Sequence, residues 1–276
     1  MTTFLIQLTD LHIREPGRLT YRRIDTAHYL TQAVQSVLAL PQRPNAVVIT
    51  GDLTDFGTAA EYAHVRELLA PLAALPLYLM PGNHDDRAAL RAAFADHAYL
   101  GDSGFIQYAA DIGSLRLVAL DTLVPGRSEG ELCAERLHWL DNALAESGGR
   151  DVIVALHHPP FQSLIGHMDK IGLLRGAEEF EAIITRFPNV RRVISGHVHR
   201  SIQVAFGGTL AVTSPSTAHQ VCLDLAPDAA SAWTLEPPGF MIHAQPRGER
   251  LVSHTVASGR FDGPHPFWDA NGRLID

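Results

Sequence analysis

Residues 46–52 read Ala46-Val47-Val48-Ile49-Thr50-Gly51-Asp52, an unbroken run of aliphatic and β-branched residues that ends in a glycine and a carboxylate. Such a run is typical of a strand buried on both faces, as in a parallel sheet covered by helices. The pattern recurs four times, because strands expected at 4–8, 77–80, 152–156 and 190–194 are each followed closely by Asp, Asn or His. Since the carboxyl ends of such strands face one crevice, we expect these polar side chains to meet there.

Helical patterns alternate with these strands over residues 1 to about 215, which predicts a layered α/β architecture. Helices are expected at 24–38, 61–72, 86–94, 134–145 and 178–187, and a further strand at 115–120. After Ser201 the pattern is rich in strands, at 202–206, 210–213, 221–225, 233–235, 240–244 and 251–257. The last two are separated by a Pro-Arg-Gly turn and are predicted to pair as a hairpin. We therefore divide the chain into a main domain, residues 1–220, and a small C-terminal β appendage, residues 221–276.

The closing stretch 263–268, Gly-Pro-His-Pro-Phe-Trp, is too rich in proline and aromatic residues to be a flexible linker. We predict that it docks on the main domain or on a second subunit.

Composition restricts the classes of partner. Of the 276 residues 46% are hydrophobic, which is enough for a core, and no apolar run is long enough to span a membrane. The N-terminus enters a strand at once, without a secretory signal, so a cytoplasmic location is expected. The net charge is 22 − 30 = −8 and no basic block occurs, which argues against long nucleic acids as partners. Small phosphate substrates remain possible, because bound metal ions would supply positive charge locally.

The polar residues that follow the strands are oxygen and nitrogen ligands without thiolates, a set that suits hard or borderline divalent metals. Taken singly, each has an ordinary interpretation, such as a helix-capping Asp, a turn Asp after glycine or a surface His. Their co-occurrence after five strands favours a metal site. The residues are Asp10 and His12, Asp52, Asn83 with His84 and Asp85, His157 with His158, and His197 with His199.

The order of these motifs, D-x-H, G-D, G-N-H-D, H-H and G-H-x-H, resembles the calcineurin-like metallophosphoesterase family over residues 4 to about 215. The resemblance implies a four-layer α/β sandwich with two divalent metal ions per chain, and Mn, Fe, Co and Zn all fit the ligands. By motif position, one metal would take Asp10, His12, Asp52 and His199. The other would take Asp52, Asn83, His157 and His197, with Asp52 as the bridge.

The family's chemistry implies roles for the neighbouring residues. A hydroxide between the metals would attack phosphorus. His84, beside Asn83, is the candidate to stabilise charge or to protonate the leaving group. Asp85 and His158 are expected to support the ligands from behind, in competition with purely structural roles.

Departures from the motifs of other subfamilies narrow the choice of subfamily. Protein Ser/Thr phosphatases have G-N-H-E at the third motif, whereas this chain has Asp85, and purple acid phosphatases have a tyrosine ligand where this chain has Asp55. The chain is more similar, nearly end to end, to bacterial class III cyclic-nucleotide phosphodiesterases and the related glycerophosphodiesterase. The matching motifs are at 81–86, 157–161, 168–169, 187–188, 196–199, 216–220 and 238–241. This likeness implies a substrate-side loop from Phe161 to Leu174, with His167 and His219 near the substrate.

The expected function is therefore hydrolysis of small phosphodiesters, such as glycerophosphodiesters, cyclic nucleotides or phosphonate monoesters, by a homo-oligomer (dimer or higher). One alternative is a phosphomonoesterase or nucleotide pyrophosphatase of the same fold. The other is a non-catalytic scaffold, which His84, His157, His197 and His199 argue against because such proteins usually lack the catalytic histidines.

Overall fold

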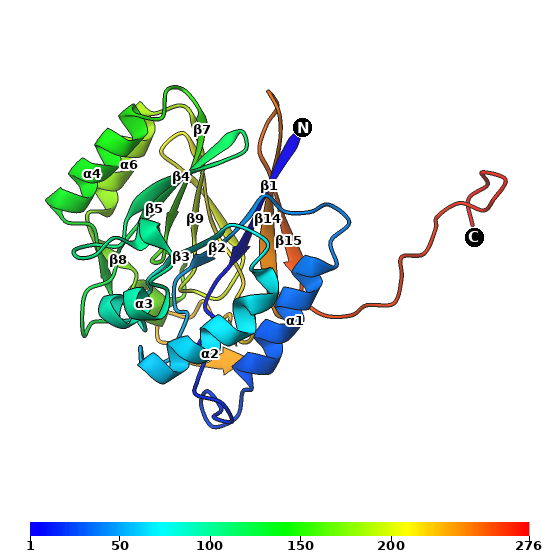
Figure 1. Ribbon diagram of the computed structural model, residues 1–276, viewed down its shortest axis with the longest axis horizontal. Helices are drawn as coiled ribbons and strands as arrows, with labels where there is room; N and C mark the ends of the chain where they lie inside the picture. The colour runs from blue at the N-terminus through cyan, green and yellow to red at the C-terminus, as the bar shows by residue number, and fades with distance from the viewer. Residues whose placement is uncertain (276) are drawn as a thin grey trace.

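The run at 46–52 forms a fully buried strand in the first of two sheets, as its composition predicts. The computed structural model describes residues 1–275, and in it β2 (Ala46–Thr50) lies between β1 (Thr2–Leu8) and β3 (Leu77–Met80), all three parallel. Every residue of β2 is buried, because the second sheet covers one face of this sheet and helices cover the other (Figure 1). The sheet has the order β15-β14-β1-β2-β3.

The second sheet packs against the first and has the order β10-β11-β9-β7-β5-β4. Its four central strands are parallel, whereas β4 and β10 pair antiparallel to their neighbours at the two edges. Gly207 and Gly208 form the turn that joins β10 to β11, and both have positive φ, which a residue with a side chain rarely adopts. The strands are β4 (Tyr108–Ile112), β5 (Leu115–Leu120), β7 (Asp151–Leu156), β9 (Val190–Ser195), β10 (Ile202–Phe206) and β11 (Thr209–Thr213).

Helices form the outer layers, so the α/β sandwich has the four layers that the resemblance implied. Figure 1 shows α1 (Thr26–Leu38) and α2 (Ala59–Leu69) side by side on one outer face, with α4 (Ala134–Ala145) and α6 (Ala177–Arg186) on the opposite side of the molecule. α3 (Arg87–Ala93) contacts α2. The short helices are η1 (Ala70–Leu72), η2 (Ala98–Leu100) and α5 (Gly166–Asp169). Among residues 1–275 there is no helix with the length and apolar character that crossing a bilayer requires.

Two short strand pairs lie outside the sheets. β6 (Gly130–Glu131) pairs with β8 (Leu173–Arg175), and β12 (Gln220–Val221) pairs with β13 (Trp233–Thr234). The strand predicted at 221–225 is therefore wrong beyond Val221. Leu223 and Leu225 are exposed, because no neighbouring strand pairs with the chain there.

The C-terminal strands differ from the expected appendage. β14 (Gly239–Pro246) and β15 (Val252–Ala257) form the predicted hairpin, but β14 also pairs antiparallel with β1, from Thr2–Pro246 to Gln7–Met241. Phe240 and Met241 are fully buried in the main core. The sheet that carries Asp10 is thus completed by residues well beyond 220, since β1 would otherwise be an open edge.

A buried glutamine ties the two sheets together behind the strand ends. Gln7 Nε2 donates to Thr50 Oγ1 (3.0 Å) within the first sheet and to the Ser195 carbonyl (3.0 Å) in the second. His243 of β14 donates from Nε2 to Gln7 Oε1 (3.0 Å) and accepts at Nδ1 from Ser253 Oγ (2.8 Å). These bonds provide a partner for the Gln7 amide oxygen and for both nitrogens of the His243 ring, as buried polar atoms require.

The tail packs on its own chain only as far as Ser258, which is buried, and Gly259, whose N–H donates to Ser36 Oγ (3.1 Å). Figure 1 shows residues after 259 running away from the sandwich, and Phe267 (78% exposed) and Trp268 (59%) are solvent-accessible. Docking of residues 263–268 on the main domain is therefore wrong for the isolated chain, and docking on a second subunit stays a prediction.

Truncation tests the part that β14 plays. A chain that ends at Val221 loses β14, Phe240 and Met241, so we expect no cooperative thermal unfolding transition. A matched chain that ends at Arg260 loses only exposed residues and should keep its melting temperature within about 2 °C. Circular dichroism melting of both chains checks this. Cooperative melting of the shorter chain near the full-length temperature would show that residues 222–276 are a separable appendage.

The His243 imidazole should make stability depend on pH. Burial, and then the positive charge of Arg192, lower its pKa to about 3 in the folded protein from 6.5. Its contribution to stability is therefore complete above about pH 6.5 and is lost as the pH falls from there toward 3, because only the unfolded chain binds the proton. By pH 5.5 the free energy of unfolding should fall by about 1.4 kcal/mol from this group alone.

Denaturant unfolding of the wild type and of His243→Gln, between pH 7.5 and 5.5 with a chelator present, isolates this contribution. The wild type should lose more stability than the variant over this interval. Parallel pH profiles of the two proteins would contradict the assignment.

Candidate metal centre

The predicted ligands meet at one end of the sandwich, where strands of both sheets end. Asp10 and His12 follow β1, Asp52 follows β2 and Asn83 follows β3, all from the first sheet. The second sheet supplies the histidines after β7 and β9, namely His157, His197 and His199. The structure thus brings together all seven residues that the resemblance assigns as metal ligands.

The backbone at these residues is unusual. Eight non-glycine residues among the described part of the chain have positive φ, and five of them are the predicted ligands Asp10, His12, Asp52, His197 and His199. Such a conformation costs about 1–3 kcal/mol per residue and is found chiefly at functional sites. Hydrogen bonds between the loops hold it, including Asp10 N–Gly51 O (3.1 Å) and His12 N–Asp52 O (3.0 Å).

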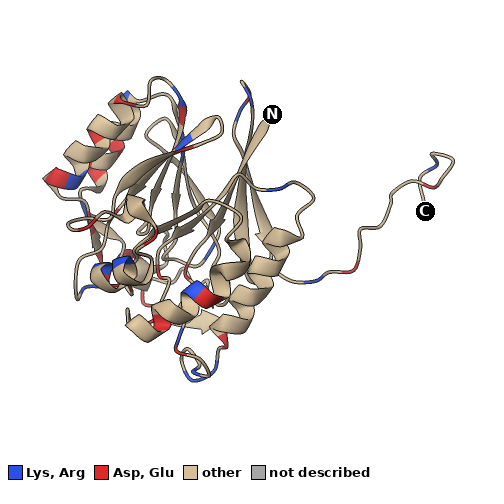
Figure 2. Ribbon diagram, in the orientation of Figure 1, with Lys and Arg blue, Asp and Glu red and all other residues tan. Residues whose placement is uncertain are grey.

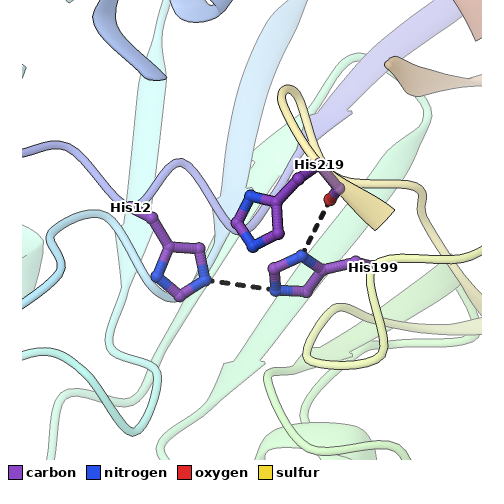
Figure 3. A group of neighbouring side chains, drawn as sticks. All are labelled: His12, His199 and His219. Atoms are coloured by element: carbon purple, nitrogen blue, oxygen red, sulfur yellow. Dashed lines mark hydrogen bonds between the residues drawn. The ribbon is translucent and has the colours of Figure 1, made fainter. Parts of the chain in front are cut away.

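One group of side chains gathers around His12. Its Nε2 lies 3.1 Å from His199 Nε2 and 3.6 Å from Asp52 Oδ2. His199 Nε2 in turn lies 3.6 Å from Asp10 Oδ1. Figure 3 shows the His12 and His199 rings facing each other edge to edge, with the ring of His219 beside them.

A second group gathers on the other side of Asp52. His157 Nε2 lies 3.3 Å from Asp52 Oδ2 and 3.1 Å from Asn83 Oδ1. His197 Nδ1 lies 3.0 Å from the same Asn83 oxygen. The Asp52 carboxylate therefore faces both groups.

Hydrogen bonds to backbone carbonyls fix which histidine nitrogens carry protons. Nδ1 of His157 donates to the Thr50 carbonyl (2.8 Å), and Nδ1 of His199 donates to the His219 carbonyl (2.9 Å). In a neutral imidazole Nε2 then has a lone pair and no proton. In both residues this lone pair points at other hydrogen-bond acceptor atoms. Lone pairs of nitrogen and oxygen that converge in a buried site repel one another unless a cation lies between them.

The pKa directions agree with this arrangement. Burial lowers the pKa of His157, but the Asp52 carboxylate outweighs it and raises the pKa to about 9. Burial likewise opposes protonation of His12, yet Asp55, Asp52 and Asp10 raise its pKa above the usual value. By contrast burial, aided by neighbouring imidazoles, lowers the pKa of His197, and burial lowers that of His199 to about 4. The site thus favours positive charge next to Asp52 and neutral, ligand-competent histidines around it.

These residues fit divalent metal ions. Ligand atoms about 2.1 Å from one ion lie about 3.0–3.4 Å from each other in octahedral or tetrahedral geometry, close to the separations of His12, His199, His157, His197 and Asn83 given above. Groups of histidine and aspartate able to hold a cation include Asp10 with His12 and Asp52. The donors are imidazole nitrogens, carboxylates and an amide oxygen, so nothing in the set selects a thiolate-preferring metal.

His84, the predicted proton donor, lines the cavity beside the predicted ligands. Its backbone N–H donates to Asp52 Oδ1 (2.9 Å), and its Nδ1 donates to the Asp55 carbonyl (2.9 Å). The ring packs edge-on against His12 at 4.7 Å between centroids, and 35% of the side chain is exposed. Because Nδ1 is committed to a carbonyl, Nε2 is the atom that is free to exchange a proton with a ligand in the cavity.

Asp85 stabilises the ligand loops rather than orienting a histidine. Its buried carboxylate accepts from the backbone N–H groups of Leu53 (3.1 Å) and Gly82 (2.9 Å) and from the Tyr62 hydroxyl (2.8 Å). It also accepts from the N–H and hydroxyl of Thr54. Asp85 thus joins the loops that carry Asp52 and Asn83, and its hydrogen bonds in the described structure involve no imidazole.

His158 lies near enough to His157 and His197 to form a group that could hold an ion, but hydrogen bonds engage both of its ring nitrogens. Nδ1 accepts from the Thr122 hydroxyl (2.8 Å), and Nε2 donates to the Ser128 carbonyl (3.1 Å). Burial, and then the charge of His157, lower its pKa to about 3. A Cβ at Gly130 would lie only 2.5 Å from the ring, so the loop closes tightly over it. His158 therefore anchors the loop that brings Ser128 to the site.

A cavity of about 560 Å³ opens over the ligands. His167 and His219 line it, as predicted, whereas Phe161 does not and packs against the main core instead. Sequence reasoning missed Tyr21, Ser128 and Trp233 as lining residues. Nothing in the local sequence marks them, because they lie in irregular loops or a two-residue strand that only the tertiary structure places at the cavity. Further lining residues are Met168, Ile171, Val221, Ser231 and Ala232.

Comparison with known sequences points to one family. The family described as calcineurin-like phosphoesterase matches residues 5–201. A protein named probable glycerophosphodiester phosphodiesterase GpdQ, from Arcobacter nitrofigilis, is 33% identical over 272 residues, which are 99% of either chain. A 3',5'-cyclic adenosine monophosphate phosphodiesterase CpdA from Pseudomonas aeruginosa is 32% identical and covers 87% of this chain and 84% of its own.

Solved structures share the fold at much lower identity. A dimetal phosphatase from Danio rerio superposes with a TM-score of 0.62 and 16% identity, over 92% of this chain and 98% of its own. GAP50, the anchor in the inner membrane complex of Plasmodium, superposes with a TM-score of 0.58 and 13% identity, over 100% and 87%. At such identity these likenesses concern the fold alone. The sequence matches and the clustered histidine and aspartate ligands together show that the chain belongs to the calcineurin-like phosphoesterase family.

Proposed function

We propose that the chain is a dinuclear-metal phosphodiesterase that hydrolyses small phosphodiesters. The single observation that carries the proposal is the position of the Asp52 carboxylate between two ligand groups, 3.6 Å from His12 on one side and 3.3 Å from His157 on the other. One ion would be held by Asp10, His12, Asp52 and His199, and the other by Asp52, Asn83, His157 and His197. Glycerophosphodiesters, cyclic nucleotides and phosphonate monoesters are candidate substrates, and the names of the curated relatives support the diester class.

The ions, when bound, would polarise the phosphoryl oxygens and lower the pKa of a water that attacks phosphorus. The residues of the chain orient the substrate and move the proton. His84 Nε2 faces the cavity and is placed to donate a hydrogen bond or a proton to the leaving oxygen. The Asn83 amide oxygen faces His157 Nε2 and His197 Nδ1, and an ion bound between them would fix the loop that carries His84. Two divalent ions and the two carboxylates of Asp10 and Asp52 leave a net charge of +2 for an anionic diester.

The distribution of charge supports a small substrate. Lys and Arg are scattered over several elements in Figure 2 and form no continuous stripe of the kind that tracks a nucleic-acid backbone. The cavity is closed in by the loops of β12–β13 and α5, and its volume of about 560 Å³ suits a drug-sized molecule. Long nucleic acids are therefore not expected to be substrates.

The predicted cytoplasmic location and homo-oligomeric state stay predictions. The exposed Phe267 and Trp268 of the tail support the latter, because exposed aromatic residues commonly become buried between subunits.

The substrate class is tested with metal-depleted protein that is reloaded separately with Mn(II), Fe(II), Co(II) or Zn(II). Hydrolysis of bis(p-nitrophenyl) phosphate should require metal, disappear with chelator and exceed hydrolysis of p-nitrophenyl phosphate. A strong preference for the monoester would instead favour a phosphomonoesterase, and metal-loaded protein without either activity would favour the scaffold alternative.

Two substitutions separate metal binding from proton transfer. Asp52→Ala removes a ligand shared by both groups, so metal analysis should find fewer than two ions per chain and activity should be lost.

His84→Ala should keep both ions but slow the hydrolysis of diesters with alkoxide leaving groups by about 10²- to 10⁴-fold.

The same pair of variants can contradict the assignments. Two ions per chain in Asp52→Ala would exclude Asp52 as the bridge. Equal slowing of p-nitrophenolate and alkoxide leaving groups in His84→Ala would exclude an acid role, because p-nitrophenolate leaves without protonation.

A further inference from the structure

We infer that Tyr21 and Trp233 form an aromatic wall that selects diesters whose alcohol part carries a planar aromatic ring over those with a polyol. This inference rests on the proposed function and names the substrate group that the same cavity prefers. Tyr21 and Trp233 come from distant parts of the chain, and their rings stack with centroids 5.8 Å apart and planes 13° apart.

The ring of His219 lies between the wall and the predicted metal ligands. His219 packs at 4.7 Å from the His199 ring and at 5.5 Å from the His12 ring, between centroids. On its other side Tyr21 approaches it edge-on at 5.4 Å and Trp233 at 6.1 Å. A phosphate held at the ligands would therefore direct its ester group past His219 and onto the wall.

The loop that carries Tyr21 is held in place from the site itself. Thr20 and Thr26 both donate their hydroxyls to the carbonyl of His12, at 3.0 and 2.9 Å. Thr20 and Ile24 pair backbone to backbone, which leaves a tight three-residue turn. In this turn Tyr21 and Arg22 have φ of 49° and 58°, although neither is glycine. A strained turn fixed to a ligand loop holds Tyr21 in position before any substrate arrives.

Part of the cavity lining is aliphatic. Met168, Ile171 and Val221 contribute this surface, and Met168 and Val221 belong to a small second hydrophobic cluster. Polar groups also line the cavity, among them His167 and His219, whose Nδ1 atoms have no hydrogen-bond partner in the described structure. The preference for a ring therefore rests on the wall and the aliphatic surface, where a flat ring gains contact area and a hydroxyl group gains no hydrogen bond.

The wall also has free surface for a ligand. Tyr21 is 52% exposed in the absence of substrate, and Trp233 is partly buried. Trp233 lines the cavity whereas Arg23, whose guanidinium lies 6.0 Å from the Trp233 ring centroid, is not a lining residue. A planar ring that packs on Tyr21 and Trp233 buries aromatic surface that water now covers.

Binding of two phosphonates isolates this contact without any turnover. Phenylphosphonate and methylphosphonate present the same phosphonate group, with a ring or a methyl group attached, and are compared at an alkaline pH where both are dianions. Calorimetry on the Mn(II)-loaded protein should show phenylphosphonate bound about 3- to 10-fold more tightly. That ratio should fall to about 1 in Trp233→Leu and Tyr21→Ala, and Tyr21→Phe, which keeps the ring, should retain it. Trp268→Ala, which removes an exposed tail tryptophan, is the matched control and should leave the ratio unchanged.

The source of the ring is tested by competition of adenosine 5′-phosphate, phenyl phosphate and glycerol phosphate against bis(p-nitrophenyl) phosphate. Stronger competition by adenosine 5′-phosphate identifies a nucleobase, and stronger competition by phenyl phosphate a simple aryl group. Equal binding of the two phosphonates by the wild type, or an unchanged ratio in folded Trp233→Leu and Tyr21→Ala, would overturn the inference. Either result would contradict the aromatic wall and leave the proposed diester hydrolysis unaffected. A protein that shows the ratio but hydrolyses no diester would contradict the proposed function and leave the wall unaffected.

Discussion

The arrangement of the site depends on a backbone constraint at the ends of the strands. Five of its residues, Asp10, His12, Asp52, His197 and His199, adopt a left-handed conformation that L-residues avoid. This conformation turns the chain sharply after β1, β2 and β9, and after β1 and β9 residues two positions apart both direct their side chains to the crevice. Its cost is met by hydrogen bonds from loop to loop, such as His197 N to Asp10 Oδ1 (3.0 Å). The Asp10 carboxylate accepts a hydrogen bond from the backbone N–H of the loop that follows β9 in the other sheet. This bond therefore fixes the distance between the two sheets at the site.

Buried polar groups behind the site also hold the two sheets and the ligand loops at fixed positions. Gln7 connects the sheets through Thr50 and Ser195, two or three residues before the ligands begin. Asp85 connects the loops after β2 and β3 through backbone N–H groups. Each of these groups would be costly to bury alone, and each is satisfied by partners on a different element. The loops of the predicted ligands are thus positioned by a rigid framework, as the proposed metal site requires.

The sequence predicted the parts of this protein that leave a local signal. The bounds of β2, Ala46–Thr50, were predicted correctly because an unbroken apolar run ended at Gly51. The seven ligands could be grouped because each follows a strand. β4 (Tyr108–Ile112) was missed, since an edge strand with two alanines lacks a strong pattern. The partner of β14 and the meeting of Tyr21 with Trp233 were missed for another reason: contacts between residues over 200 positions apart leave no trace in either segment.

The pairing of β14 with β1 has a consequence for biosynthesis. β1 is synthesised long before β14, which pairs with it and ends at Pro246. While the residues between them are being made, β1 has an unpaired edge, the kind of surface that recruits chaperones or aggregates. The sheet that holds the loop with Asp10 and His12 is therefore finished only after β14 has been made.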